Sequence, residues 1–285
     1  MSKVIAVHGG AGVRRRDKPG PQQVAVLKQA LEAAYRQKTA IDAVTAAVTI
    51  LEDSPLFNAG RGSCFNAAGE IEMDASVMDG ERLRAGAVAA VQRIRNPVLA
   101  ARLVMEKTRH VLLAGDGAEQ LARQHGLQLE PPEYFHTALR RSALQRKLKS
   151  HHGTVGAVAL DEDGNLAAAT STGGYTGKLP GRIGDSPLIG AGNYADNRAC
   201  AVSGTGLGEA FIRAAVAYDV AARMRYRGES LASAARAALR NVARLGGDGG
   251  LIAVDRRGNV AMPFNSEGMY RGSIHRRGRT TIAIF

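Results

Sequence analysis

Thr154, directly behind Gly153, occupies a position in this sequence that could carry chemistry. After the glycine the chain runs through small and β-branched residues, turns at residues 161–165 and returns through a second apolar run to Thr172. This pattern predicts a strand, a tight turn and a second strand. If the bond between Gly153 and Thr154 were cut, Thr154 would carry a free α-amino group with a pKa of about 7.7 to 8.0, which could accept the proton of its own hydroxyl. On these residues alone, an ordinary start of a strand is the alternative explanation.

The elements that must position this threonine do not alternate cleanly between strand and helix. The apolar periodicity predicts strands over residues 3–8, 69–80, 85–94, 188–193, 198–203 and 280–285, hairpins over 154–172 and 249–263, and helices over 21–37, 40–52, 97–107, 115–124, 209–226 and 230–245. Ser230 is the expected N-cap of the last helix. Helices gather between groups of adjacent strands, which favours antiparallel sheets covered by helices and therefore an α+β fold.

Two details of this pattern concern possible sites. The glycines that follow His8 do not indicate a dinucleotide site, because no second strand arrives soon enough to complete the βαβ unit. Asp74 lies in the middle of the strand expected over residues 69–80, and a buried charge at a strand centre needs a partner.

Residues 131–153 divide the chain into two halves. Pro131 and Pro132 interrupt regular structure, and residues 140–149 are strongly basic around a few leucines. We expect a flexible basic linker here. An exposed segment directly before a potential cleavage point is where a chain can be divided without harm to its core.

The composition limits the class of protein. With 45% hydrophobic residues and 34 glycines in 285 residues, the chain can bury a substantial core. It contains no run of about 18 apolar residues and begins with a strand-like segment, so we expect neither a membrane span nor a signal peptide. Cys64 and Cys200 have no metal-ligand spacing, and a reducing cytoplasm is the expected location.

The net charge of +12 raises nucleic acid as a partner. Against this, the basic residues are scattered, aromatic residues make up only 5%, tryptophan is absent, and no recognition-helix or base-stacking pattern is present. A non-catalytic basic protein that binds nucleic acid remains an alternative, but we do not expect nucleic acid as the partner.

Eight segments, in order along nearly the whole chain, carry a resemblance to one family. They are VIAVHGGAG from Val4, PLFNAG from Pro55, MDASVMDG from Met73, GTVGAVALD from Gly153, AAATSTGG from Ala167, KLPGRIGDSP from Lys178, GTGLGE from Gly204 and PFNSEGMYR from Pro263. Together they resemble the N-terminal nucleophile hydrolases of the isoaspartyl peptidase and plant-type L-asparaginase family. Each segment alone is weak evidence, but the set is highly specific.

The resemblance implies a fold and a processing event. The fold would be a four-layer αββα sandwich in which two stacked sheets are covered by helices, with residues 1–285 forming one domain. The chain would cleave itself between Gly153 and Thr154 into an α chain of residues 1–153 and a β chain of residues 154–285. Two such αβ units would pair as a homodimer.

The resemblance also implies a role for individual residues. Thr154 would be the nucleophile, first toward the Gly153 carbonyl and then toward substrate. Thr172 would hydrogen-bond to the Thr154 hydroxyl and tune it. Thr205 and the Gly206 amide would form the oxyanion hole. Asn58 would lie near the nucleophile, and Gly174 would contribute to substrate binding.

Arg182 and Asp185 match the substrate-binding segment of the family. A guanidinium suits the α-carboxylate of an amino acid, and a carboxylate suits its α-ammonium. Their spacing in one loop lets both face a small zwitterion. Without the family match, an exposed ion pair of little consequence would be the preferred explanation.

The implied cofactors are limited to one ion. The resemblance implies a structural sodium ion held by backbone carbonyls in the loop that follows the second helix, and it implies no organic cofactor. The carbonyls are those of Leu51, Glu52, Ser54, Phe57, Ala59 and Arg61.

The predicted activity is hydrolysis of β-aspartyl dipeptides and of L-asparagine, with L-aspartate as the product, through a threonine acyl-enzyme. A glycosylasparaginase of the same fold is the closest alternative. That family usually carries an aspartate before the nucleophile and follows a secretory route, whereas this chain has Gly153 and no expected signal peptide.

Overall fold

Two β-sheets lie face to face at the centre of the molecule, in a computed structural model that describes residues 3–15, 20–146, 153–275 and 279–285. The larger sheet contains, in spatial order, β12 (Thr280–Ala283), β11 (Met269–Ile274), β1 (Val4–Ala11), β5 (Thr154–Leu160), β6 (Leu166–Thr172), β2 (Met73–Asp79), β3 (Arg84–Val91) and β4 (Leu112–Ala114). The smaller sheet contains β10 (Val260–Ala261), β9 (Gly249–Asp255), β8 (Cys200–Gly206) and β7 (Asn193–Ala195). All of these pairings are antiparallel except that of β3 with β4.

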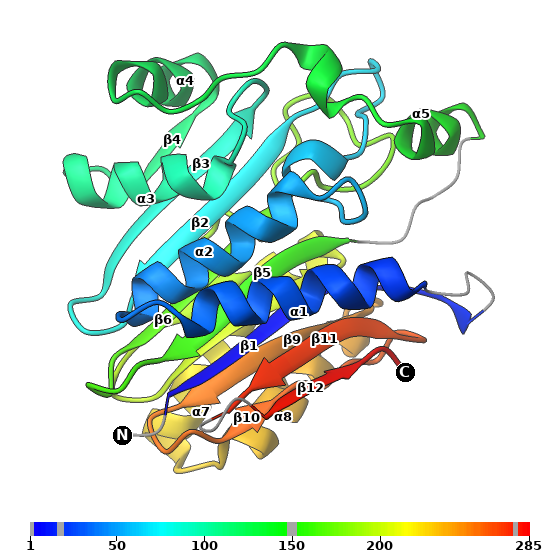
Figure 1. Cartoon of the computed structure of the whole chain (residues 1–285). Coiled ribbons are helices and arrows are strands. Elements are labelled where there is room, and N and C mark those ends of the chain that lie inside the picture. The colour runs from blue at the N-terminus through cyan, green and yellow to red at the C-terminus, as the bar shows by residue number, and fades with distance from the viewer. Residues whose placement is uncertain (1–2, 16–19, 147–152, 276–278) are drawn as a thin grey trace.

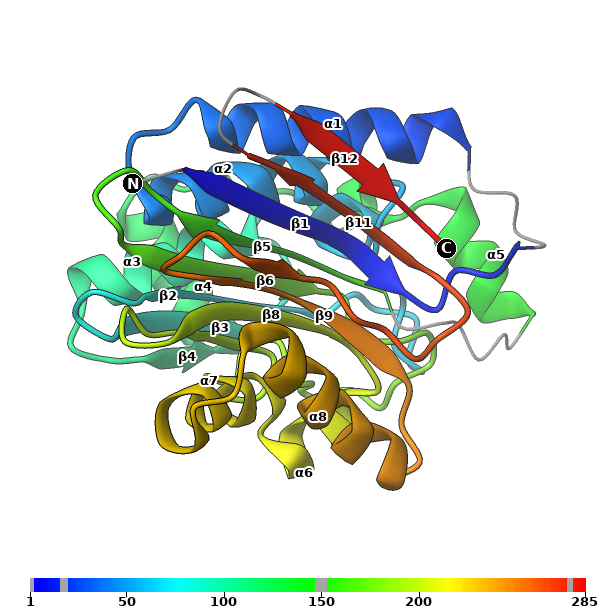
Figure 2. The ribbon, with the colours of Figure 1, turned by 90° about the horizontal axis from the view of Figure 1, so that it is seen from below.

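Helices cover the outer faces of both sheets. Over the larger sheet lie α1 (Pro21–Tyr35), α2 (Ala40–Asp53), α3 (Pro97–Lys107) and α4 (Gly115–Gln124), as Figure 1 shows. Over the smaller sheet lie α6 (Gly208–Ala214), α7 (Val216–Arg227) and α8 (Leu231–Arg244), on the opposite side of the molecule in Figure 2. The expected α+β fold, a four-layer αββα sandwich, is confirmed.

Strands β5 and β6 are buried along their whole length because they have a layer on each side. Side chains alternate across a strand. Val155 and Ala157 therefore belong to the core beneath the helices of the larger sheet, whereas Val158 and Leu160 belong to the core between the two sheets. By this alternation Thr154 faces the space between the sheets.

The hairpin that begins at Thr154 is present as predicted. Its turn is held by the Asp161 carboxylate, whose Oδ1 accepts hydrogen bonds from the amides of Asp163 at 3.1 Å and Asn165 at 2.8 Å. Oδ2 accepts from the amide of Ala40 at 3.0 Å, which joins the turn to the start of α2. The resulting register places Thr154 directly opposite Thr172.

The long helices begin close to the predicted positions because their signals are local. Ser230 caps α8 as expected, with its hydroxyl accepting from the Ser233 amide at 3.4 Å.

The prediction of one continuous helix over residues 209–226 was wrong. The structure divides this segment into α6 and α7 at Ala215, whose φ is +45°. Past the break, the amides of Ala217 and Tyr218 donate to two carbonyls of residues 190–191, in the loop before β7, at 3.0 and 2.8 Å. These tertiary hydrogen bonds redirect the chain.

The strand expected over residues 188–193 was also wrong. These residues form turns, in which the amides of Leu188 and Gly192 both donate to the Asp185 carbonyl, at 3.0 and 3.1 Å. The regular strand β7 starts only at Asn193. Strands β4 and β11 were not predicted. Strand β11 owes its place to pairing with β1, which is distant in sequence, as well as with the neighbouring β12.

The segment expected as a linker contains regular structure in its first part. Residues 131–146 include the 3-10 helix η3 (Pro132–Phe135) and the helix α5 (Ala138–Gln145), with Thr137 as N-cap. Both helices are ordered because each makes a contact with the rest of the fold. The Phe135 ring of η3 is fully buried, and Nε of Arg140 in α5 donates to the Gly62 carbonyl at 2.6 Å. Residues 147–152 lie outside the described part of the chain. No described helix is both long and apolar enough to cross a membrane.

Gly156 on β5 provides a test of how closely the sheets approach. A Cβ at this position would collide with the Ser203 hydroxyl of the smaller sheet and lie 2.5 Å from Nε2 of His8. Gly156→Ala is expected to lower the free energy of unfolding by about 1–3 kcal/mol, because overpacking forces backbone shifts. Thermal denaturation followed by circular dichroism measures the effect. Gly117→Ala in α4 is the control, since a Cβ there meets nothing within 4 Å. Equal midpoints for the two variants would contradict this close approach.

Candidate active site

The hydroxyls of Thr154 and Thr172 form the centre of the site. Thr154 Oγ1 donates to Thr172 Oγ1 at 3.1 Å, and both side chains are buried. Thr172 Oγ1 in turn donates to the Gly153 carbonyl at 3.2 Å and accepts from the Gly174 amide at 3.0 Å. One hydroxyl therefore contacts both the group expected to attack and the carbonyl expected to be attacked.

The close approach of Gly10 to this centre requires a glycine. Its φ is +108°, and a Cβ there would lie 2.9 Å from Cα of Gly153 and 3.2 Å from the Thr154 nitrogen. Strand β1 thus ends against the bond that the sequence predicts to be cut. Any larger residue at this position would displace that bond.

Asn58 lies behind Gly153 and supports the loop beside it. Its Nδ2 donates to the Gly174 carbonyl at 2.6 Å, and its Oδ1 accepts from the Cys64 amide at 2.9 Å. The Asn58 carbonyl accepts from the Gly173 amide at 3.1 Å. The structure thus places Asn58 next to Gly153, with both polar atoms of its side chain bonded to backbone.

Thr205 and Gly206 are the last two residues of strand β8. Thr205 is fully buried, and its Oγ1 accepts from the Ala11 amide at 3.1 Å. A Cβ on Gly206 would lie 2.7 Å from Cα of Gly249, so the two strands meet here through glycines. The Gly206 backbone lines the same small pocket as Thr154.

Arg182 and Asp185 face the same pocket, as the sequence predicts. Nε and Nη2 of Arg182 each lie 2.9 Å from the Glu209 carboxylate, and the guanidinium stacks 4.7 Å from the centre of the Tyr175 ring. Asp185 is buried, and its Oδ2 has no hydrogen-bond partner among the described atoms. Burial raises the pKa of Asp185 to about 6. A buried carboxylate oxygen without a partner is suited to bind a cation.

The pocket itself is narrow in the unbroken chain. Its lining residues are Thr154, Thr172, Gly174, Tyr175, Arg182, Gly184, Asp185 and Gly206. Its volume is about 10 Å³, which is room for roughly one water molecule. The structure therefore brings Thr154, Thr172 and the two charged residues together at one pocket that Gly206 also lines. Asn58 lies against Gly153, and Thr205 does not line the pocket.

Two residues that contact Arg182 were not predicted. Glu209 follows Thr205 by four residues at the start of α6, and Tyr175 follows the predicted Gly174. The acidic end of the GTGLGE segment was the signal available for Glu209. Nothing in the sequence indicated that its partner would be Arg182, 27 residues earlier.

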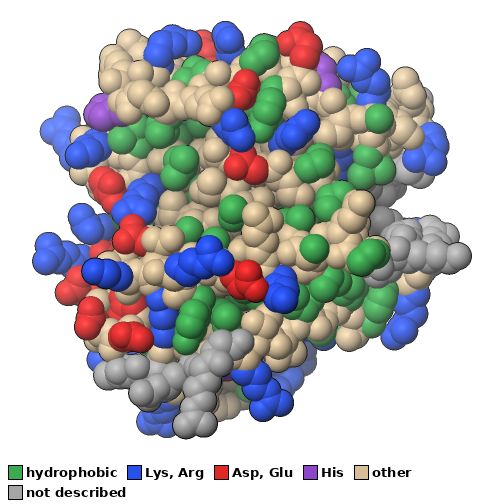
Figure 3. Space-filling model, viewed as in Figure 1, with side chains coloured by type: hydrophobic (Ala, Val, Ile, Leu, Met, Phe, Trp, Pro, Cys, Tyr) green, Lys and Arg blue, Asp and Glu red, His purple; other side chains and the backbone are tan. Residues whose placement is uncertain are grey.

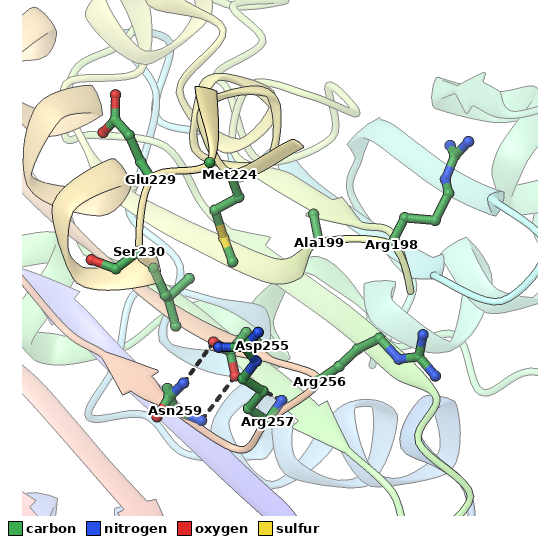
Figure 4. A pocket seen from close by; sticks show the side chains of 11 residues that line it. Arg198, Ala199, Met224, Glu229, Ser230, Asp255, Arg256, Arg257 and Asn259 are labelled. Atoms are coloured by element: carbon green, nitrogen blue, oxygen red, sulfur yellow. Dashed lines mark hydrogen bonds between the residues drawn. The ribbon is translucent and has the colours of Figure 1, made fainter. Parts of the chain in front are cut away.

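A larger hollow, of about 710 Å³, lies away from this chemistry (Figure 4). It is lined by residues that include Arg198, Met224, Asp255 and Arg256, at the end of β8 and β9 opposite to Thr205. The Asp255 carboxylate is occupied by hydrogen bonds from its own turn. None of the predicted site residues lines this hollow.

The loop after α2 fits the sodium ion that the resemblance implies. Leu51 and Glu52 lie in the last turn of the helix, whose carbonyls have no amide partner within the helix, and Pro55 has no N–H to supply one. A Cβ on Gly60 would lie 2.5 Å from the Glu52 carbonyl oxygen, and a Cβ on Gly62 would collide with the Phe57 carbonyl. Several carbonyl oxygens therefore turn toward these glycines. Oxygen ligands of this kind suit a hard cation.

Of the remaining predicted ligands, Ala59 already accepts a hydrogen bond, from the Gly62 amide at 3.1 Å. A carbonyl oxygen has a second lone pair, so this bond does not prevent coordination. Among the described residues, no group of His, Cys, Asp and Glu side chains is arranged to hold a metal.

Comparison with known proteins agrees with the fold. The chain matches the family described as asparaginase over residues 1–151 and 145–284. It is 54% identical to an isoaspartyl peptidase of Escherichia coli K12, across 94% of this chain and 91% of that protein. It is 42% identical to an isoaspartyl peptidase/L-asparaginase of Bos taurus, across 94% of this chain and 92% of that protein. The chain therefore belongs to the asparaginase family, and the predicted resemblance is confirmed.

The Asp185 carboxyl is expected to titrate near pH 6 in the folded protein, because burial disfavours its charged form. It would be neutral below that pH and negative above it, so its attraction for an ammonium group is lost as the pH falls through 6. Carbon NMR of aspartate-labelled protein measures the midpoint, and Asp185→Asn identifies the resonance. A midpoint near the ordinary value of 3.8 would contradict the buried environment.

Proposed function

We propose that this chain cleaves itself before Thr154 and then hydrolyses the side-chain amide of L-asparagine and of β-aspartyl dipeptides. The single observation that carries the proposal is the hydrogen-bonded series from the Thr154 hydroxyl through Thr172 to the Gly153 carbonyl. Membership of the asparaginase family makes the chain a hydrolase. Its relatives that are named isoaspartyl peptidase and isoaspartyl peptidase/L-asparaginase support this choice of substrates.

Self-cleavage begins with attack of Thr154 Oγ1 on the carbonyl carbon of Gly153. Negative charge develops on the carbonyl oxygen, to which Thr172 already donates a hydrogen bond. The C–N bond breaks, the nitrogen takes up the proton that the Thr154 hydroxyl has lost, and the Gly153 acyl group is transferred to the threonine oxygen as an ester. Water hydrolyses the ester, which leaves Gly153 with a carboxylate and Thr154 with a free α-amino group.

Turnover uses that amino group as a base. It accepts the Thr154 hydroxyl proton while the oxygen attacks the side-chain carbonyl of the substrate. Thr205 and the Gly206 amide stabilise the oxyanion. Ammonia, or the amino group of the second residue of a dipeptide, leaves with a proton. Water then hydrolyses the β-aspartyl ester and releases L-aspartate.

Substrate is held by its α-carbon substituents. Arg182 binds the α-carboxylate and Asp185 binds the α-ammonium. Because Glu209 occupies Nε and Nη2 of Arg182, the substrate carboxylate uses the remaining Nη1, which lies toward pocket-lining Gly184.

The alternative functions have less support. The relatives compared above carry the names isoaspartyl peptidase and isoaspartyl peptidase/L-asparaginase, which support the proposed substrates over those of a glycosylasparaginase. On the face shown in Figure 3, Lys and Arg side chains are dispersed among acidic and hydrophobic ones and form no continuous basic surface. A nucleic-acid partner would need such a surface.

The assembly and location remain part of the proposal. We place the enzyme in the cytoplasm as a homodimer of αβ units. Support for a reducing compartment comes from Cys64 and Cys200, which are both buried and free. The homodimer rests on the family resemblance.

Self-cleavage provides the direct test. Wild-type protein should separate on denaturing electrophoresis into fragments whose masses correspond to residues 1–153 and 154–285. Thr154→Ala should stay whole, because it has no nucleophile. Thr172→Ala should slow cleavage by about 10²- to 10³-fold, since it removes a donor to the developing oxyanion. Thr281→Ala, on an exposed part of β12, is the matched control. Wild-type protein that is folded but remains whole would overturn the proposal.

The sodium ion is expected to stabilise the folded protein without taking part in the reaction. The carbonyls of the loop after α2 would hold it, and its binding would anchor the loop that carries Asn58. Replacing sodium chloride by choline chloride should lower the thermal midpoint, because a ligand that binds only the native state stabilises it. Titration with sodium should restore the midpoint in a saturable way. An identical midpoint in both salts would argue against the ion.

A further inference from the structure

Asp74 is a buried carboxylate that the proposed mechanism does not use. It is fully inaccessible on β2, and the sheet register places it directly opposite Thr172. Thr172 is opposite Thr154 on the next strand. Directly paired residues share one face of a sheet. Asp74, Thr172 and Thr154 therefore form a row across three neighbouring strands, on the face between the sheets.

The first oxygen of Asp74 fixes an irregularity in the sheet. Between Met73 and Ala75 the register of β2 with β3 shifts by a residue, which is a β-bulge. Ala90 in this bulge has a φ of +52°, and its amide donates to Asp74 Oδ1 at 2.9 Å. The bulge gives the carboxylate a backbone partner within the sheet.

The second oxygen of Asp74 reaches the loop that carries the substrate-binding charges. Oδ2 accepts from the Gly184 amide at 3.4 Å. Gly184 lies between Arg182 and Asp185 in the chain and lines the pocket. The hydrogen bond therefore fixes the backbone between the Arg182 and Asp185 side chains.

Two further residues hold the same loop: Ser76 on the same face of β2, and Glu72 directly before the strand begins. Glu72 Oε1 accepts from the Gly181 amide at 2.8 Å, and Ser76 Oγ donates to the Ser186 carbonyl at 2.5 Å. Asp74 and Ser76 are two residues apart on β2 and so share a face. Together with Glu72, they contact the loop from residue 181 to residue 186.

Charge balance around the row is provided by a buried lysine. Lys178 is 1% exposed, and its Nζ donates to the Glu72 carbonyl at 2.8 Å. Burial raises the pKa of Asp74, whereas the positive charges of Lys178 and Arg182 oppose that rise. The loop is therefore attached to β2 by its own cation as well as by its amides.

We propose that Asp74, assisted by Glu72, is a positioning residue for substrate recognition. It holds the backbone at Gly184 so that Arg182 and Asp185 keep the separation that fits the carboxylate and the ammonium on one α-carbon. The ligand class is therefore an L-aspartyl group whose α-carboxylate and α-ammonium are both free. This inference rests on the proposed function. It assigns Asp74 no part in self-cleavage, because its side chain makes no hydrogen bond to Gly153 or Thr154 among the described contacts.

The test is Asp74→Asn in the full chain. Asparagine has nearly the same shape but lacks the charge and one of the two acceptor oxygens, so we expect KM for L-asparagine to rise by about 10- to 100-fold. The value of kcat and the rate of self-cleavage should stay within about twofold of wild type, because the contact between Asp74 and Gly184 affects substrate binding and not the attack by Thr154. Asp79→Asn, at the end of the same strand, is the matched control and should leave KM unchanged.

A wild-type KM in Asp74→Asn would overturn the inference. So would a loss of self-cleavage together with a lower thermal midpoint, because that pattern describes a purely structural residue. If Asp74→Asn does not fold, Glu72→Ala decides the question: it removes the carboxylate oxygen that accepts from the Gly181 amide and should also raise KM without slowing self-cleavage.

Failure of the proposed function can be told apart from failure of this inference. The affinity for L-aspartate, measured by calorimetry, requires no chemistry. If the wild-type chain neither cleaves itself nor hydrolyses amides, the function fails. A weaker affinity in Asp74→Asn than in Asp79→Asn would still support the positioning role, and equal affinities would reject it.

Discussion

The backbone register between β5 and β6 is the constraint on which the site depends. It brings the hydroxyls of Thr154 and Thr172 to 3.1 Å, and the same register, continued to β2, adds Asp74 to the row. A slip of one residue would turn all these side chains to the opposite face, beneath the helices. The turn held by Asp161 and the close packing at Gly156 oppose such a slip. The register therefore determines which groups can meet.

The energetic cost of the site lies in its buried charges. Asp74, Asp185 and Lys178 are almost wholly removed from water, which is unfavourable for each of them alone. Backbone amides and the charge of Lys178 compensate Asp74, and the Glu72 carbonyl accepts a hydrogen bond from Lys178. One oxygen of Asp185, by contrast, has no hydrogen-bond partner within the described part of the chain. A substrate ammonium would supply the missing partner. The fold thus keeps an unsatisfied carboxylate where the proposed substrate binds, and this is consistent with its raised pKa.

The sequence allowed prediction of features that depend on local signals. The hairpin from Thr154 and the cap at Ser230 follow from turn and capping residues within a few positions. It did not allow prediction of features set by distant contacts. The break at Ala215 depends on carbonyls of another loop, and Asp74 finds its amide partners 16 and 110 residues away. A buried charge at a strand centre predicted that a partner must exist, but it did not predict which one.

The most direct measurement of the central claim is the mass of the protein during turnover. Wild-type enzyme mixed with L-asparagine is quenched in acid within milliseconds, and the peptides are separated and weighed. Our account predicts that the peptide beginning at Thr154 gains the mass of one aspartyl group on its hydroxyl and loses it when substrate is exhausted. An aspartyl group on any other residue, or rapid product formation while every peptide stays unmodified, would contradict Thr154 as the nucleophile.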